Sequence, residues 1–261
     1  MQDAFAPSAA APLDQADGLR RMFGGARQRC IALIANPHVA HTGVLLERLT
    51  AALAGADLQV LLVDAANASP PLPGLALIDL GGCIEPMDAH TSYLPARGLP
   101  RAHVDARGSA AGLLDALAVA APLAEVVLIH GEAADLARVF QRRDARPILL
   151  AADDQESIKY AYAAFKIFAQ RCGLVTFDLL LAAPDGARAR AITANLASCA
   201  ERFLGALLNA SAVVDPAADA APGQDLRELL ARQLAIDILP GLPAGTAVTS
   251  NSYRDRHATT N

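Results

Sequence analysis

Short apolar runs alternate with amphipathic stretches along most of this chain. Six runs have the length and near-continuous apolar character of strands buried on both faces, and they cover residues 30–35, 58–65, 75–80, 124–130, 147–152 and 174–183. Apolar residues recur at helical spacing over residues 44–53, 112–119, 133–141, 155–171, 187–204 and 226–234. This alternation predicts an α/β fold, in which a doubly wound, mostly parallel sheet carries helices on both faces.

Residues that begin or end helices support these assignments. Asp154 is placed to cap the helix predicted at 155–171, and Gly173 and Gly205 stand where helices commonly end on a glycine. Residues 66–74 are assigned only as a loop, and residues 85–104 receive no assignment.

The same patterns divide the chain into three parts. Residues 1–29 are rich in Ala and Pro and then in Gly and Arg, which predicts a flexible N-terminal segment. Residues 30–248 are expected to form one α/β domain, and residues 249–261 a disordered polar tail.

Composition excludes several classes of protein. Hydrophobic residues make up 53% and charged residues 19%, which indicates an ordered core over most of the chain. A net charge of −5 provides no overall field to hold nucleic acid. The four cysteines form no CxxC pair, and neither a leader peptide nor a run of eighteen apolar residues is present. We therefore expect a cytoplasmic protein that does not span a membrane.

The loop after the first predicted strand is the natural place for a phosphate site in such a fold. It covers residues 35–43 and contains a single glycine and no lysine, since both lysines of the chain lie within 155–171. Pro37 removes a backbone donor, and His38 puts a side chain where backbone must approach a phosphate. Thr42 keeps the hydroxyl that could serve a magnesium ion. Binding of an anion at the following helix N-terminus stays open.

Other polar residues stand at site-like positions. Asp64, Asp79 and His130 each end a predicted strand, although such residues more often cap helices or bond to turns. His38 and His41 have a spacing that could share a metal, but no third ligand is indicated, and we expect no metal site.

An isolated amphipathic turn lies near the N-terminus, at residues 14–23. Asp14 can cap it, and Leu19, Met22 and Phe23 then share one face. The segment is too short to be stable alone. It either folds on a partner or packs back on its own domain, and the physics of the sequence favours neither.

This segment carries a family resemblance. The residues that match are Asp14, Gln15, Ala16, Leu19 and Arg20, which form the pattern DQAxxLR. The pattern resembles the N-terminal motif of the FlhG (FleN) family, which comprises MinD/ParA-type factors that regulate flagellar number and placement. The resemblance covers about residues 14–242 and is strongest at 14–20 and 148–205. It implies the P-loop NTPase fold of that family, whose members use ATP and magnesium; for this chain no cofactor is established, and ATP with magnesium stays open.

The nucleotide site implied by the resemblance has lost several groups. The corresponding positions are Asn36 at the signature lysine, His41 at the Walker lysine, Thr42 at the Walker threonine, Asp64 at the first aspartate of the next strand, Ala66 at the second, and His130 at the switch aspartate. The missing lysines and aspartates neutralise charge, hold metal and position water in phosphoryl transfer. The resemblance therefore implies a pseudo-ATPase.

The resemblance also implies an activity toward a partner. In the family this motif binds FlhF, a GTPase of the signal-recognition-particle type, and accelerates its GTP hydrolysis. Gln15 would orient the attacking water, since an amide both donates and accepts. Asp14 and Arg20 would position the helix, and Leu19 would anchor it. Flagellar switch (C-ring) proteins or a flagellar transcription factor are further partners that the resemblance implies, as is recruitment to the flagellated pole.

Two other functions stay open from the sequence. One is a divergent MinD/ParA-type ATPase that dimerises with ATP and uses Thr42, backbone amides and arginines in place of lysine. The other is a non-catalytic flagellar adaptor. After Pro240 the chain lacks the apolar face of the family's membrane helix, so we do not expect membrane cycling.

Overall fold

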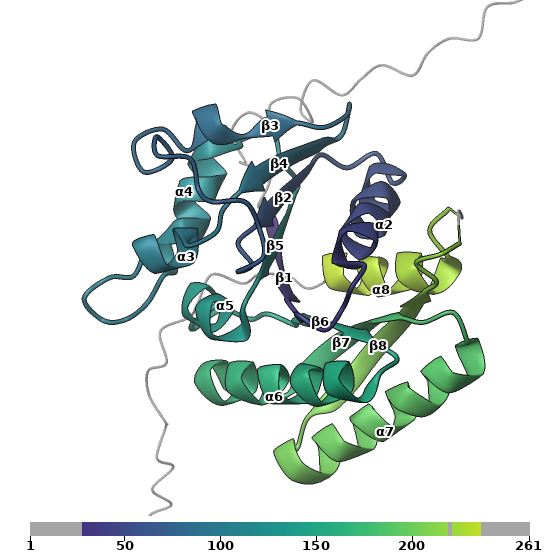
Figure 1. Cartoon of the computed structure of the whole chain (residues 1–261). Helices are drawn as coiled ribbons and strands as arrows, with labels where there is room; N and C mark the ends of the chain where they lie inside the picture. The colour runs from purple at the N-terminus through teal and green to yellow at the C-terminus, as the bar shows by residue number, and fades with distance from the viewer. Residues whose placement is uncertain (1–27, 219–220, 236–261) are drawn as a thin grey trace, which may run out of the picture.

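The computed structural model describes residues 28–218 and 221–235 (Figure 1). Within these residues, eight strands form one sheet in the order β3-β4-β2-β5-β1-β6-β7-β8. The strands are β1 (Arg29–Ile34), β2 (Val60–Asp64), β3 (Glu85–Pro86), β4 (Thr91–Pro95), β5 (Val126–Gly131), β6 (Ile148–Ala152), β7 (Thr176–Ala182) and β8 (Leu207–Val214). All neighbours pair in parallel except β3 and β4. The predicted α/β fold class is confirmed.

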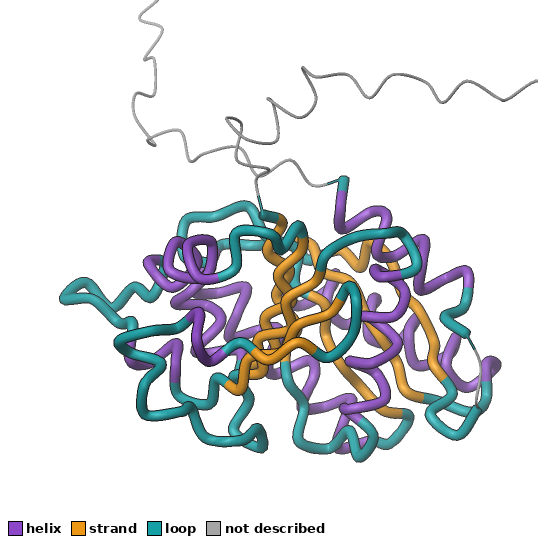
Figure 2. The backbone as a smooth tube through the Cα atoms, turned by 90° about the horizontal axis from the view of Figure 1, so that it is seen from above, coloured by secondary structure: helices purple, strands orange, loops and turns teal. Residues whose placement is uncertain are grey.

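Helices cover both faces of this sheet (Figure 2). They are α2 (Thr42–Ala54), the 3-10 turn η1 (Gly81–Cys83), α3 (Leu99–Ala102), α4 (Gly112–Ala120), α5 (Ala133–Val139), α6 (Gln155–Cys172), α7 (Gly186–Leu204) and α8 (Gln224–Leu234). None of these helices is long and apolar enough to cross a membrane.

Alternation along the strands supplies two separate cores. In β1, Ile31 and Leu33 pack with α2 and α8, while Ala32 and Ile34 belong to the core under α4, α5, α6 and α7. Because both faces are covered, the strands are apolar at nearly every position, which is why the sequence pattern found most of them.

The predicted helix ends are confirmed. The carboxylate of Asp154 accepts a hydrogen bond from the backbone N–H of Ser157 at 2.9 Å. Gly173 and Gly205 have φ values of 69° and 62°, the left-handed conformation that ends a helix at low cost for glycine.

One predicted strand is wrong. Residues 75–80 form a turn rather than a strand, and Ile78 is 86% exposed. The strand beside β2 is β4 instead, within the unassigned segment 85–104. Tyr93 and flanking polar residues give β4 no continuous apolar run, so its pairing with β2 decides its conformation. Asp79 therefore ends no strand, and its carboxylate accepts from the Gly82 N–H within the turn.

Candidate functional site

The carboxyl ends of the central strands β1, β2, β5 and β6 lie at one edge of the sheet, where folds of this kind bind ligands. Residues 35–41 connect β1 to α2 at this edge. Four of the predicted site residues lie here: Asp64 on β2, His130 on β5, Asn36 in the loop after β1, and Thr42 at the first position of α2.

The side chain of Asn36 is buried, and both its amide nitrogen and its amide oxygen form hydrogen bonds within the protein. Its Nδ2 donates to the carbonyl oxygens of Leu150 in β6 and Ser157 in α6, at 3.0 and 2.9 Å. Its Oδ1 accepts from the N–H of His38 at 3.0 Å. The side chain thus ties the loop to the neighbouring strand and helix, and it points into the protein instead of toward a ligand.

The rest of the loop is held from within as well. Thr42 donates its hydroxyl to the carbonyl of Val39 at 2.8 Å. Val39 is buried in the core beneath α2, whereas His41 is exposed and its side chain makes no capping bond. The loop therefore packs around the buried side chain of Val39. In a phosphate loop, backbone N–H groups at this point would surround the ligand.

Asp64 and His130 form a pair on adjacent strands, in which His130 is buried and Asp64 is partly buried. They face each other in the register of β2 and β5, and His130 Nδ1 lies 2.7 Å from Asp64 Oδ1. The hydroxyl of Tyr93 donates to the other carboxylate oxygen at 3.4 Å. Burial, followed by the charge of Asp64, raises the pKa of Tyr93 to about 12. His130 Nε2 is buried and finds no partner among the described residues.

Because of this pairing, the free energy of unfolding is expected to decrease at low pH. Burial alone would raise the pKa of Asp64, but the hydrogen bond and charge of His130, with bonds from Ser69 and Ala66, hold the pKa below 3.8. A carboxyl with a lowered pKa stabilises the folded state above its unfolded pKa, and this stabilisation is lost as the pH falls through the folded value. We expect the free energy of unfolding to fall less steeply below pH ~4 in Asp64→Asn than in the wild type.

Urea unfolding between pH ~2.5 and ~6 measures this difference. The exposed Asp144 provides a matched control, and Asp144→Asn should keep the wild-type slope. Equal slopes in Asp64→Asn and the wild type would contradict the assignment of the acid dependence to Asp64.

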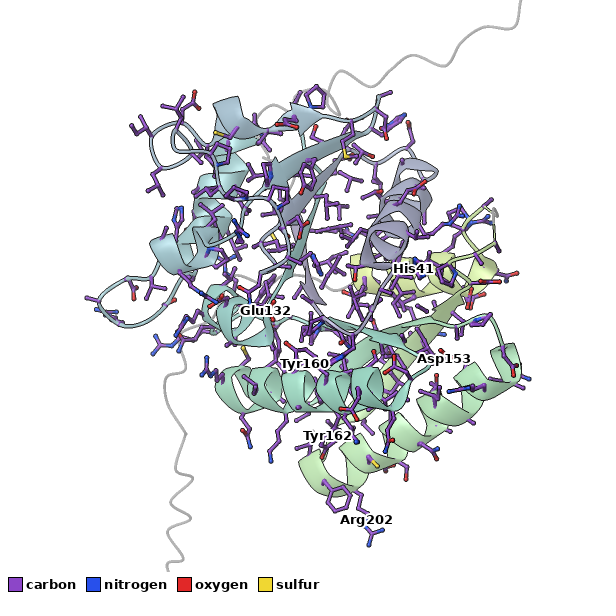
Figure 3. The ribbon with its side chains drawn as sticks, viewed as in Figure 1. His41, Glu132, Asp153, Tyr160, Tyr162 and Arg202 are labelled. Carbon is purple, nitrogen blue, oxygen red and sulfur yellow. The ribbon has the colours of Figure 1, made fainter. Side chains whose placement is uncertain are left out.

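A second polar cluster, which the sequence patterns did not predict, lies beside the first and includes Glu132 and Tyr160 (Figure 3). The hydroxyl of Tyr160 donates to Glu132 Oε2 at 3.1 Å, and the ring of His38 meets that of Tyr160 edge-on at 5.7 Å. Burial, followed by the charge of Glu132, raises the pKa of Tyr160 to about 12. The position of Glu132 directly after β5 was the available signal, because strand-end carboxylates gather at this edge.

Three carboxylates gather at this edge, and two of them have a basic partner, since His130 lies beside Asp64. Asp64, Glu132 and Asp153 lie at the ends of β2, β5 and β6, and Arg188 Nε pairs with Asp153 at 3.4 Å. Among the described residues no group of three His, Cys, Asp or Glu side chains is arranged to hold a metal ion. The motif residues Asp14, Gln15, Ala16, Leu19 and Arg20 lie outside the described residues.

Solved structures share this fold. A cobyrinic acid a,c-diamide synthase from Mycobacterium smegmatis, with bound ADP and magnesium, is 17% identical with a TM-score of 0.56, over 83% of this chain and 99% of its own. A plasmid partition protein from Borrelia burgdorferi is 13% identical with a TM-score of 0.55, over 79% and 100%. The MinD cell division protein of Aquifex aeolicus is 12% identical with a TM-score of 0.51, over 81% and 98%.

The chain matches no protein-family model and no curated protein sequence. The structural likenesses show that it has the fold of MinD/ParA-type P-loop ATPases. At these low identities they show the fold alone.

The start of the loop, at Pro37 and His38, lacks groups that would hold the phosphates of a magnesium nucleotide in this fold. A phosphate loop needs free backbone donors and a cation beside the phosphates. Here Pro37 has no N–H, the N–H of His38 is bonded to Asn36, and Asn36 stands where the resemblance places a lysine. The neighbouring carboxylate of Glu132, which accepts from the Tyr160 hydroxyl, would repel a polyphosphate.

Proposed function

We propose that this chain is a FlhG-like regulator of flagellar number and placement that stimulates GTP hydrolysis by an FlhF-type GTPase. The stimulating group is the N-terminal motif that contains Gln15, and the MinD/ParA-type domain is a pseudo-ATPase. The observation that carries the second half is the buried Asn36 side chain, which bonds to Leu150, Ser157 and His38 at the position of a nucleotide lysine.

The first half rests on chemistry that the motif retains. A glutamine amide can accept from and donate to a water molecule, and so can aim it at a γ-phosphate. Asp14 and Arg20 position the short helix on the partner, and Leu19 anchors it. In this proposal the activity of the protein is exerted in the site of another molecule, while its own fold provides the scaffold and further contacts to flagellar switch proteins or a transcription factor.

GTP turnover by the purified FlhF-type GTPase tests this function, with and without the full chain. The wild-type chain should raise turnover, and Gln15→Ala should return it to the basal rate while leaving the circular dichroism unchanged. Gln2→Ala is the matched control, since it removes the same amide from the same segment outside the motif. No stimulation by the wild type, or equal stimulation by Gln15→Ala, would overturn the proposal.

The pseudo-ATPase half has its own test. We expect the full chain with magnesium and ATP to show no turnover above that of a buffer blank. Saturable ATP turnover that is lost in Thr42→Ala would instead identify a divergent ATPase, because it would require the Thr42 hydroxyl to leave the Val39 carbonyl and serve a metal ion.

A further inference from the structure

Two segments that meet near the edge of the sheet opposite the candidate site each expose two large apolar side chains. Leu77 and Ile78 belong to the turn after β2, and Val119 and Leu123 lie at the end of α4 and just after it. Their exposed fractions are 65%, 86%, 83% and 82%. We call these four residues the amino-edge patch.

The two segments that form the patch touch each other. Gly81 lies so close to α4 that a Cβ at this position would be 3.4 Å from the carbonyl oxygen of Ala120. η1 stands at the end of α4 in Figure 1. Leu80, Cys83 and Ala121, which belong to the same two segments, are partly buried and pack against the core. Single exposed apolar residues need no explanation, but a group continuous with the core indicates a contact surface.

The described part of the chain begins at this patch. Gln28 donates its side-chain amide to the carbonyl oxygen of Ala121 at 2.5 Å, and Ala121 lies between Val119 and Leu123 in the sequence. Only residues 24–27 separate Gln28 from the amphipathic segment that ends at Phe23. Five extended residues span at most about 17 Å, so the segment stays within reach of the patch.

This tether raises the local concentration of the segment. A short flexible linker gives an effective concentration of about 1 mM, so an interaction with a dissociation constant of about 0.2 mM would be largely formed within one chain. The short linker therefore favours residues 14–23 as the occupant of the amino-edge patch over a partner molecule at micromolar concentration.

The chemistry of the two surfaces is complementary. The segment carries Leu19, Met22 and Phe23 on one face, with Arg20 and Arg21 beside them. The patch offers apolar side chains of similar extent.

Carboxylates flank those apolar side chains. Asp79 follows Ile78, and Asp115 lies one helical turn before Val119, on the same face of α4. Asp115 also has Arg143 Nη2 at 3.5 Å, and its own side chain is 81% exposed. Two arginines of the segment can thus approach two exposed carboxylates while its apolar face covers the patch.

We propose that residues 14–23 dock on the amino-edge patch of their own chain. The docked helix buries Leu19, Met22 and Phe23. The consequence for the partner rests on the proposed function: because Leu19 anchors the motif on the GTPase, docking in cis and stimulation of the partner compete, and the patch restrains the motif. The docking itself does not depend on that function.

Hydrogen exchange on the full-length chain tests the docking without any GTPase. Amides of residues 14–23 should exchange about five-fold more slowly than in an unstructured peptide of the same sequence, as an effective concentration a few times the dissociation constant requires. In Ile78→Lys/Val119→Lys the protection should disappear, since the lysines remove apolar area and repel Arg20 and Arg21. Phe203→Lys is the matched control, because Phe203 is 67% exposed on α7, which lies on the opposite side of the molecule from α4 (Figure 1). It should retain the protection.

Exchange in β5 reports whether each variant is folded. Unprotected residues 14–23 in the wild type would overturn the proposal, as would protection that survives the double lysine variant. Protection that rises with protein concentration would show docking between copies and would also overturn it.

If GTP turnover is stimulated, the double variant should reach half-maximal stimulation at a several-fold lower concentration of the chain. Absence of all stimulation would count against the proposed function and leave the exchange result standing.

Discussion

Replacing Asp178 with alanine is expected to lower the free energy of unfolding by about 3–5 kcal/mol, a large share of the stability of a typical domain. Asp178 lies in the middle of β7 and has 0% exposure. Its carboxylate accepts from Arg146 at 2.9 Å, from Asn209 at 2.9 Å and from Gln233 at 2.7 Å. These bonds join the segment before β6, the edge strand β8 and helix α8.

The cost comes from the groups left behind. Without the carboxylate, the mostly buried guanidinium of Arg146 has lost its counter-charge, and the amide donors of Asn209 and Gln233 have lost an acceptor. Arg146 Nη2 is already without a partner among the described residues, so this arginine cannot readily re-pair.

A double-mutant cycle tests this reason. Urea unfolding of Asp178→Ala, Arg146→Met and Asp178→Ala/Arg146→Met should show that the double variant costs clearly less than the sum of the single ones. Strict additivity would contradict the ion pair as the source of the effect. The exposed pair Glu156 and Lys159 is the control, and the same cycle there should give a coupling below about 1 kcal/mol.

The sequence predicted the central strands because burial on both faces makes them almost continuously apolar. It failed for β4, whose conformation depends on pairing with β2, and it placed a strand at 75–80, where an apolar run instead forms a turn with Ile78 exposed. The charged residue within the apolar run that became β7 was a usable signal. An aspartate at position 178, in the middle of a doubly buried strand, requires a buried partner.

The sequence predicted only those residues of the candidate site that lie at the ends of strands. Asp64 and His130 end neighbouring strands, and the structure brings them within 2.7 Å. The role of Asn36 could not be read from the sequence, since the partners of its amide, Leu150 and Ser157, lie more than a hundred residues away. The family resemblance placed a lysine at this position, but only the fold shows what the asparagine does.

Exchanging Asn36 for aspartate is expected to destabilise the protein more than exchanging it for alanine, although aspartate is nearly isosteric with asparagine. Asn36→Ala removes the donor to two carbonyl oxygens and should cost about 1–3 kcal/mol. Asn36→Asp puts a carboxylate oxygen against the same carbonyls at a site that is 4% exposed, which leaves a buried charge unpaired and should cost about 3–5 kcal/mol.

Urea unfolding at neutral pH measures this order, and lowering the pH should narrow the gap, because the carboxyl group introduced by Asn36→Asp regains a donor once it is protonated. Asn67→Asp is the matched control: Asn67 follows the next strand, is exposed, and engages Glu132 only through its backbone N–H. If Asn36→Asp were as stable as Asn36→Ala, the amide would not be locked into the fold, and the position would be free to serve a ligand. The pseudo-ATPase proposal would then lose its main support, whereas stimulation by Gln15 would remain to be judged on its own assay.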